Sequence, residues 1–181
     1  MTGPQPVPFR GMNPAPDPDR DALEAALAGR GEYELFACDP ALADTAAFCA
    51  HYGFAMEDSA NTIVVVGKGA EPVYAACVVL ATHRLAVNQV IKARWGRKSS
   101  FATPEETREI TGHEIGGVTV FGLPEDLPVW VDAAVMARDR IVLGGGSRSW
   151  KVIAPPAILR TLPGVEIVGG LANPAPLRNP A

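Results

Sequence analysis

The sequence has little of what metal sites and disulfide frameworks require. Cysteine and histidine each occur only three times in 181 residues. Cys38, Cys49 and Cys77 are odd in number, lie far apart and form no CxxC pair, which predicts buried thiols in a reducing compartment. No histidine stands at a metal-ligand spacing from a Cys, an Asp or another His. Neither a metal centre nor a disulfide is therefore expected.

Long apolar runs are also missing. No uninterrupted stretch is long enough to span a bilayer, and the N-terminus lacks the basic and apolar regions of a signal peptide. We therefore expect a cytoplasmic protein. The Pro-rich residues 1–19 and 173–181 have few large apolar side chains and are predicted to be flexible tails. Residues 20–172 are expected to form a single domain around one core.

Positive charge is scarce as well. The chain has 16 Lys and Arg against 20 Asp and Glu, a net charge of −4, whereas a strong non-specific grip on nucleic acid needs many cations facing phosphates. A small local footprint is compatible with this balance, because Lys92, Arg94, Arg97 and Lys98 gather around Trp95. A solvated helix end explains that cluster at least as well, since Lys and Arg are favoured at helix C-termini.

Several familiar catalytic motifs are absent. The sequence contains no GxSxG, no HExxH, no GxxxxGK[ST], and no GxGxxG between a strand and a helix. Metal-dependent hydrolysis and nucleotide hydrolysis both lose support.

What the sequence does contain is a mixture of helical and strand patterns. Helices are predicted from residue 19 to 29 or 31, and over residues 39–53, 88–94, 103–112 and 155–164. Strands are predicted at residues 33–38, 62–66, 73–80, 99–102, 128–132, 140–146, 150–154 and 165–170. The segments 62–66 and 73–80 form a predicted hairpin, and 128–132, 140–146 and 150–154 are expected in one sheet. With no repeat and no regular βαβ alternation, the pattern predicts a mixed α/β (α+β) domain, with a mixed central sheet flanked by helices.

The strongest local signal is a capping box. Thr103-Pro104-Glu105-Glu106 combines a cap, a proline at the first helical position and an acid three residues after the cap. It predicts a helix that stops at Gly112.

Glycine is concentrated in two short stretches. The first, residues 111–124, contains Gly116 and Gly117, and the second is GGGSRSW at residues 144–150. Glycine costs about 0.5–1 kcal/mol relative to alanine inside an element, so a cluster indicates a sharp turn or a close approach. A connector explains the first stretch, and the alternative there is a site. A tight β-turn explains the second stretch, and the alternative there is an anion nest with Arg148 beside it. We expect the two stretches to open on one cleft. His113 enters the first stretch and is expected to be an exposed loop residue without a role.

From about residue 39 to residue 171 the chain resembles the YbaK/EbsC family, the prolyl-tRNA synthetase editing-domain superfamily of aminoacyl-tRNA deacylases. The most specific match is ATPEETREITGHEIGGVTVFGLPEDLPVWVD at residues 102–132. It is similar to the family's run of A-T/S-P-E-E, T-G-x-x-x-G-G-V-S-P-F-G and L-P-V-x-x-D. NTIVVV, RLAVNQVIKARWG and IVLGGGSRSWKVIAPPAIL stand in the expected order and spacing.

The resemblance implies a compact editing domain, without metal or organic cofactor, that hydrolyses the ester joining a wrong amino acid to a tRNA 3′-terminal adenosine. Its implied partners are the 3′ aminoacyl end of tRNA and an aminoacyl-tRNA synthetase, with no role for DNA or a membrane. The implied catalytic residues are Asn61 and the pair Gly116 and Gly117, whose N–H groups would stabilise the developing oxyanion. On that basis Gly117→Ala is expected to remove activity with little loss of stability. The implied substrate-binding residues are Thr62, Thr119, Gly146 and Arg148.

The chain departs from the family pattern at several positions. Many members carry a lysine immediately before the threonine that corresponds to Thr62, but this chain has Asn61, which donates hydrogen bonds and has no charge. The usual serine and proline of the loop are Thr119 and Val120.

The later glycine cluster differs too. The family's serine and acidic residue are replaced by Gly144 and Lys151, and Lys151 could supply the missing positive charge from another direction. Three hypotheses remain, in this order: a trans-acting deacylase of mischarged tRNA, a non-catalytic relative that binds tRNA or a nucleotide-like ligand, and a hydrolase of another small acyl ester.

Overall fold

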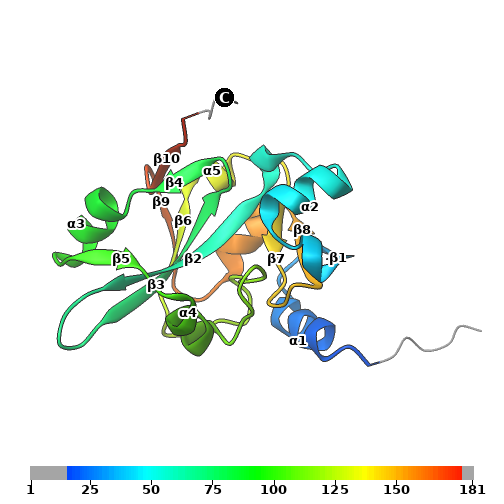
Figure 1. Ribbon diagram of the computed structural model, residues 1–181, viewed down its shortest axis with the longest axis horizontal. Coiled ribbons are helices and arrows are strands. Elements are labelled where there is room, and N and C mark those ends of the chain that lie inside the picture. Colours follow the sequence, from blue (N-terminus) through cyan, green and yellow to red (C-terminus); the bar gives the residue numbers. More distant parts are fainter. Residues whose placement is uncertain (1–15, 177–181) are drawn as a thin grey trace, which may run out of the picture.

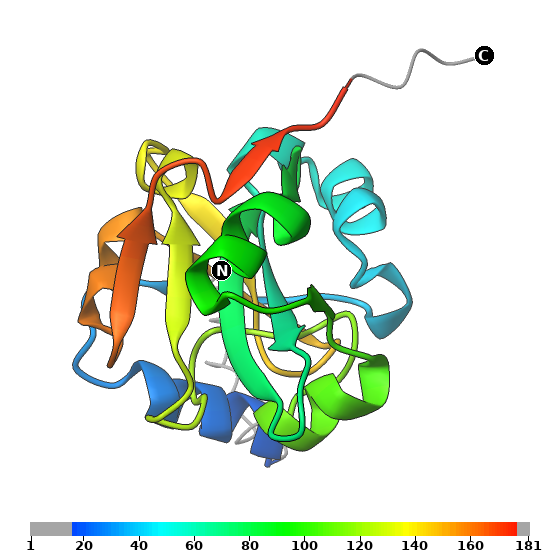
Figure 2. The same ribbon diagram turned by 90° about the vertical axis from the view of Figure 1, so that its left-hand side faces the viewer.

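Two β-sheets carry the fold in the computed structural model, which describes residues 16–176 (Figures 1 and 2). The larger sheet has five strands in the order β5-β2-β3-β6-β9, with β5, β2 and β3 antiparallel and β3, β6 and β9 parallel. Its strands are β5 (Ser99–Phe101), β2 (Ala60–Gly67), β3 (Val73–Leu80), β6 (Val129–Asp132) and β9 (Val165–Val168). The mixed α/β class predicted from the sequence is confirmed.

The smaller sheet is antiparallel, in the order β1-β8-β7, and a two-stranded ribbon pairs β10 with β4. These strands are β1 (Glu34–Ala37), β7 (Ile141–Gly144), β8 (Trp150–Ala154), β4 (His83–Leu85) and β10 (Ala172–Pro174). The α-helices are α1 (Pro18–Leu27), α2 (Thr45–Tyr52), α3 (Lys92–Trp95), α4 (Pro104–Thr111) and α5 (Ala133–Met136). Shorter helical turns are η1 (Pro40–Leu42), η2 (Met56–Asp58), η4 (Pro156–Thr161), all 3₁₀, and a π-turn η3 (Val87–Ile91).

The β2–β3 hairpin is the centre of the larger sheet. All eight residues of β2 pair with β3, from Ala60 opposite Leu80 to Gly67 opposite Val73. Alternating side chains of β3 enter two different cores, one on each face of the sheet. The hairpin predicted from residues 62–66 and 73–80 is confirmed.

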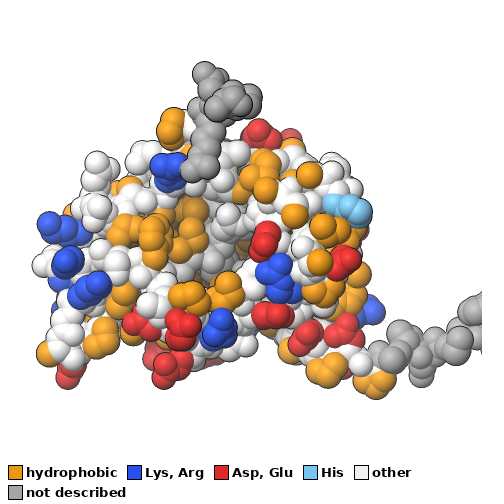
Figure 3. Space-filling model, in the orientation of Figure 1, with side chains coloured by type: hydrophobic (Ala, Val, Ile, Leu, Met, Phe, Trp, Pro, Cys, Tyr) orange, Lys and Arg blue, Asp and Glu red, His pale blue; other side chains and the backbone are white. Residues whose placement is uncertain are grey.

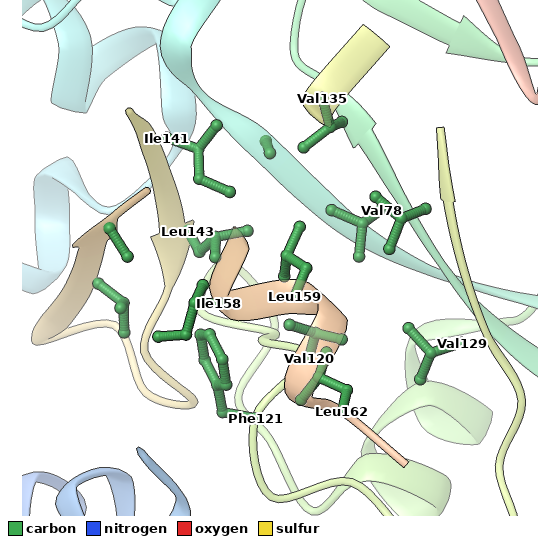
Figure 4. Packing of buried hydrophobic residues seen from close by; sticks show 14 of the residues in the cluster. Val78, Val120, Phe121, Val129, Val135, Ile141, Leu143, Ile158, Leu159 and Leu162 are labelled. Atoms are coloured by element: carbon green, nitrogen blue, oxygen red, sulfur yellow. The ribbon is translucent and has the colours of Figure 1, made fainter. Parts of the chain in front are cut away.

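The main core lies between the two sheets. Figure 4 shows η4 crossing this space, with Ile158 and Leu159 directed toward Leu143 of β7 and Val78 of β3. Phe121, from the loop after α4, is 1% exposed and packs into the same core. Burying a side chain of this size stabilises the folded state by about 1.5–3 kcal/mol. Phe121 therefore anchors the loop that follows α4 to the core.

Helix α4 begins at the predicted capping box. The Glu106 N–H donates to Thr103 Oγ1 at 3.1 Å, and the Thr103 N–H donates to Glu106 Oε2 at 2.8 Å. Gly112 ends the helix with φ +70°, a conformation that costs glycine little. The helix therefore delivers the first glycine stretch at a fixed point.

The two ends of the fold extend beyond the predicted boundaries. Asp17, rather than Asp19, caps α1, with its carboxylate accepting from the Arg20 N–H at 3.1 Å and Pro18 at the first helical position. Residues 18 and 19 thus belong to α1 and residues 173 and 174 to β10, although the sequence placed them in tails. Residues 1–15 and 177–181 lie outside the described residues.

Two other predictions need correction. The single helix expected over residues 39–53 is divided, because Asp39 caps only the turn η1 and Asp44 has an extended backbone before α2. The segments expected in one sheet are also divided: β6 joins the larger sheet, whereas β7 and β8 pair with each other and β1. A strand pattern specifies the faces of a strand but not its neighbours. No helix among residues 16–176 is long and apolar enough to cross a membrane.

Candidate functional site

A cleft of about 400 Å³ opens where the two sheets meet. One side is β2 with Phe101 of β5, another is the loop at residues 115–118, and the third contains the start of α2 and the facing positions Gly144 and Lys151. Phe101 is 56% exposed and forms part of the rim. In Figure 3 hydrophobic side chains cover the middle of this face, and Lys and Arg side chains gather to the left, over α3 and β5. The volume is in the range of small-molecule sites.

Asn61 and Thr62 of β2 line the cleft. Thr45 Oγ1 donates to Asn61 Oδ1 at 2.9 Å, so the amide oxygen of Asn61 is occupied. The Asn61 NH₂ group has no partner among residues 16–176 and remains available as a donor. Thr62 Oγ1 is buried and likewise makes no hydrogen bond within the described part of the chain. Two of the residues expected from the sequence therefore line the cleft, and Asn61 brings an unused donor to it.

The two glycine stretches are joined through Gly117. The Gly117 N–H donates to Glu114 O at 2.9 Å, and the Gly146 N–H donates to Gly117 O at 2.6 Å. A Cβ atom built on Gly117 would collide with the backbone of Ser147. The Gly117 N–H is therefore committed inside the loop, contrary to the expectation that it faces the substrate. This glycine is needed where two backbones pack against each other.

The free backbone donors of the loop are on either side of Gly117. The N–H groups of Gly116 and Val118 have no hydrogen-bond partner among the described residues, and both residues line the cleft. Gly116 has φ +92°, and a Cβ atom there would collide with the Arg148 guanidinium. Glycine at 116 thus allows both a left-handed backbone and close packing.

Lys151 of β8 lies at the base of the cleft. Lys151 is 6% exposed. Its Nζ donates to Ala43 O at 2.6 Å and lies 5.4 Å from the centre of the Phe48 ring. Burial, and to a smaller extent the positive charge of Arg148, lowers the pKa of Lys151, opposed in part by Cys38, Asp44 and Cys49. Its ammonium forms no ion pair with any Asp or Glu from residue 16 to 176.

Residues 39–162 match the model of the aminoacyl-tRNA editing domain. The chain belongs to this family. It is 30% identical over 97 residues to the uncharacterized protein YwhH of Bacillus subtilis (strain 168), a match covering 54% of this chain and 60% of YwhH. The chain thus spans about 60% of that relative's length.

Two solved structures have the same fold as this editing domain. One is described as a candidate trans-editing enzyme for prolyl-tRNA synthetase, with a TM-score of 0.73, 24% identity, and coverage of 86% of this chain and 98% of its own. The other is the hypothetical protein APE2540, with a TM-score of 0.74, 23% identity, and coverage of 84% and 99%. At these identities the likeness establishes the fold.

Three residues expected to bind substrate lie outside the cleft of the editing domain. Arg148 donates from Nε to Pro40 O at 2.9 Å, and from Nη1 to Asp44 Oδ1 and Ile115 O at 3.1 and 3.2 Å. Its guanidinium thus holds η1, the start of α2 and the glycine loop together. Thr119 and Gly146 line a separate hollow of about 220 Å³ beside α1. The prediction that both glycine stretches open on one cleft holds for Gly116 and Gly144 only.

His113 is less exposed than the sequence suggested. It is half-buried beside Gly146, its Nδ1 accepts from the Thr119 N–H at 3.4 Å, and burial lowers its pKa. This bond holds the neutral imidazole within the loop. Within residues 16–176 no three His, Cys, Asp or Glu side chains gather in an arrangement that could hold a metal ion.

The basic cluster near Trp95 is partly committed to the fold. Arg94 pairs with Glu166 and lies 4.5 Å over the Trp130 ring, and Arg97 Nη1 donates to Glu71 O at 3.1 Å. Two of the four cations therefore support strand and loop packing, which favours the structural interpretation of this cluster.

Sequence reasoning overlooked Val118. Its contribution is a backbone N–H, which no side-chain pattern can reveal. Lys151 did carry a signal, since it is a single cation inside the apolar strand WKVIA.

Proposed function

We propose that this editing domain hydrolyses the ester bond between a wrongly attached amino acid and the 3′ end of a tRNA. The observation that carries the proposal is the pair of unused N–H groups at Gly116 and Val118 on one wall of a cleft that also contains the unused amide of Asn61. Family membership supports aminoacyl-tRNA editing in general. The proposed partner is the 3′ aminoacyl end of tRNA, together with an aminoacyl-tRNA synthetase that supplies it.

In this proposal the ester carbonyl oxygen accepts from the Gly116 and Val118 N–H groups. Negative charge grows on that oxygen when the carbonyl carbon is attacked, and fixed donors stabilise it without reorganisation. Losing one such donor costs on the order of 10²–10³ in rate. The Asn61 amide, held by Thr45, orients the ester or the terminal ribose.

The attacking group is a water molecule. No serine, cysteine or histidine is among the described residues that line the cleft. The water oxygen bonds to the carbonyl carbon, the bond from that carbon to the ribose oxygen breaks, and the leaving oxygen receives a proton from the water. The products are a free amino acid and a deacylated tRNA.

A deacylation screen tests this proposal. Purified protein is incubated with a panel of mischarged tRNAs carrying labelled amino acids, with correctly charged tRNAs and a protein-free reaction as controls. We expect at least one mischarged tRNA to lose its label faster with protein, and Asn61→Ala to slow that loss.

A non-catalytic relative that binds tRNA or a nucleotide-like ligand is the second candidate. The neutral Asn61, where many family members carry lysine, favours it. If no aminoacyl-tRNA is hydrolysed while the protein still binds tRNA, this second candidate replaces the first.

A further inference from the structure

Lys151 is a buried cation whose surroundings do not balance its charge. An ammonium group has three N–H donors, and only Ala43 O accepts from it among the described residues. The Phe48 ring, 5.4 Å from Nζ, adds a weak attraction. A buried ammonium without a carboxylate partner is costly, because its hydration is lost and little replaces it.

The position of Lys151 indicates that an acceptor for its ammonium would come from a ligand in the cleft. Lys151 lines both the main cleft and a small extension of about 20 Å³, and Asn61 and Thr45 line both as well. The residue opposite Lys151 in the β7–β8 register is Gly144, which has no side chain to cover the ammonium. The unused donors of Lys151 therefore belong to the same cavity as the unused amide of Asn61.

A purely structural part for Lys151 accounts poorly for these facts. The bond to Ala43 O fixes the extended residues between η1 and α2, but a neutral donor would satisfy that carbonyl at lower cost. An apolar residue would also suit a site against Phe48. The charge is therefore better explained by a ligand.

We propose that Lys151 is the cationic substrate-binding residue of the cleft, whose ammonium donates to an oxygen of the bound aminoacyl ester. This inference rests on the proposed ester hydrolysis. It assigns the positive charge of the substrate-binding cleft to Lys151 of β8. The ester oxygens are the groups on which negative charge grows, so the interaction strengthens as the reaction proceeds.

The proposal also explains Asn61. A lysine at position 61 would share a small cavity with Lys151. Two like charges in one partly dry cavity repel each other strongly. Asn61 instead supplies a neutral donor beside the cation. One charge at either position is thus favoured, and two are not.

The first test compares kcat/KM for deacylation in three variants. Lys151→Met removes the charge and keeps the approximate volume, and we expect a loss of roughly 10- to 100-fold. Lys68→Met is the matched control, because Lys68 is exposed in the β2–β3 turn, and we expect no change. Asn61→Lys combined with Lys151→Met returns one charge to the cavity and should recover at least part of the loss.

Activity that is unchanged in Lys151→Met overturns the proposal, as does a loss that Asn61→Lys does not reduce. A wild-type protein that deacylates nothing overturns the proposed function instead, and this inference with it. The two failures are therefore distinguishable.

The second test needs no variant and covers the case in which Lys151→Met does not fold. The chain has four lysines, of which Lys68, Lys92 and Lys98 are exposed, so ¹³C-methylated lysines give few NMR signals. The wild-type protein is titrated with pH, alone and saturated with a non-hydrolysable 3′-aminoacylamido-adenosine.

We expect the midpoint of Lys151 to rise when the analogue binds, while the midpoints of the three exposed lysines stay constant. The titratable and charged groups that face Lys151 are Arg148, Asp44, Cys38 and Cys49, and Asp44 also lines the cleft. All four are present with and without the analogue, so the comparison of the two titrations isolates the effect of the analogue. A Lys151 midpoint that does not move on saturation overturns the proposal.

Discussion

Replacing Gly117 with alanine distinguishes a glycine that serves the substrate from one that serves the fold. A Cβ atom at this position would collide with the backbone of Ser147, which cannot rotate away as a side chain can. Forcing an extra methyl group into such a contact costs about 1–3 kcal/mol. Displacing the backbone bond to Glu114 O or the bond from the Gly146 N–H costs about 1 kcal/mol more.

We therefore expect Gly117→Ala to lower the free energy of unfolding by about 2–4 kcal/mol. For a chain of this length the melting temperature should fall by about 4–16 °C, at 2–4 °C per kcal/mol. Urea denaturation and a thermal scan by circular dichroism measure both quantities.

The matched control is Gly169→Ala. An added Cβ at Gly169 meets no heavy atom within 4 Å, and, like Gly117, this glycine has no positive φ. We expect its free energy of unfolding to stay within about 0.5 kcal/mol of the wild type. Equal stability of the two variants would refute the packing argument. A stable but inactive Gly117→Ala protein would instead support the earlier expectation that Gly117 contacts the substrate.

Three further outcomes follow from the site and the fold. Asn61→Ala should cost about 1–3 kcal/mol of transition-state stabilisation, measured by single-turnover deacylation. Thr45→Val should cost less, because it only frees the Asn61 amide to move. An effect of Thr45→Val with none from Asn61→Ala would contradict the proposed orientation. Burial raises the pKa of Cys77 to about 12, so its thiol should not react with a disulfide reagent at pH 8 until urea unfolds the protein, and rapid labelling in the native state would contradict this. Thr103→Ala removes one half of the capping box and should cost about 0.5–2 kcal/mol in urea unfolding, and an unchanged midpoint would show that the cap contributes nothing.

The parts of the fold that follow from the sequence are those set by neighbouring residues. The capping box at Thr103 and Glu106, and the left-handed glycine at 112, depend on contacts within one turn. The β2–β3 hairpin follows from two β-branched runs joined by a short loop. Each of these predictions was confirmed at its expected place.

The parts that do not follow depend on contacts between distant residues. The break between η1 and α2 coincides with the bond from Lys151 Nζ to Ala43 O, which joins residues 108 positions apart. The partners of β7 and β8 are likewise decided by the packing of two sheets around η4. No local pattern contains that information.

The same limit applies to the candidate site. Asn61, Thr62 and Gly116 lie at the cleft as expected, because the resemblance gave their positions along the chain. Gly117 and Gly146 lie elsewhere, because glycine is equally suited to a substrate contact and to a close contact between two backbones. A glycine cluster in a sequence indicates close approach without naming what approaches.

The free donors at residues 116 and 118 are held in place by hydrogen bonds of the protein itself. Arg148 donates to Ile115 O from one side of the loop, and Gly117 is bonded in both directions. The ion pair of Arg148 with the exposed Asp44 contributes little by itself, but the bonds to two carbonyl oxygens, at Pro40 and Ile115, tie the loop to η1. In the proposed ester hydrolysis, donors that are fixed in this way need not reorganise when charge develops on the carbonyl oxygen.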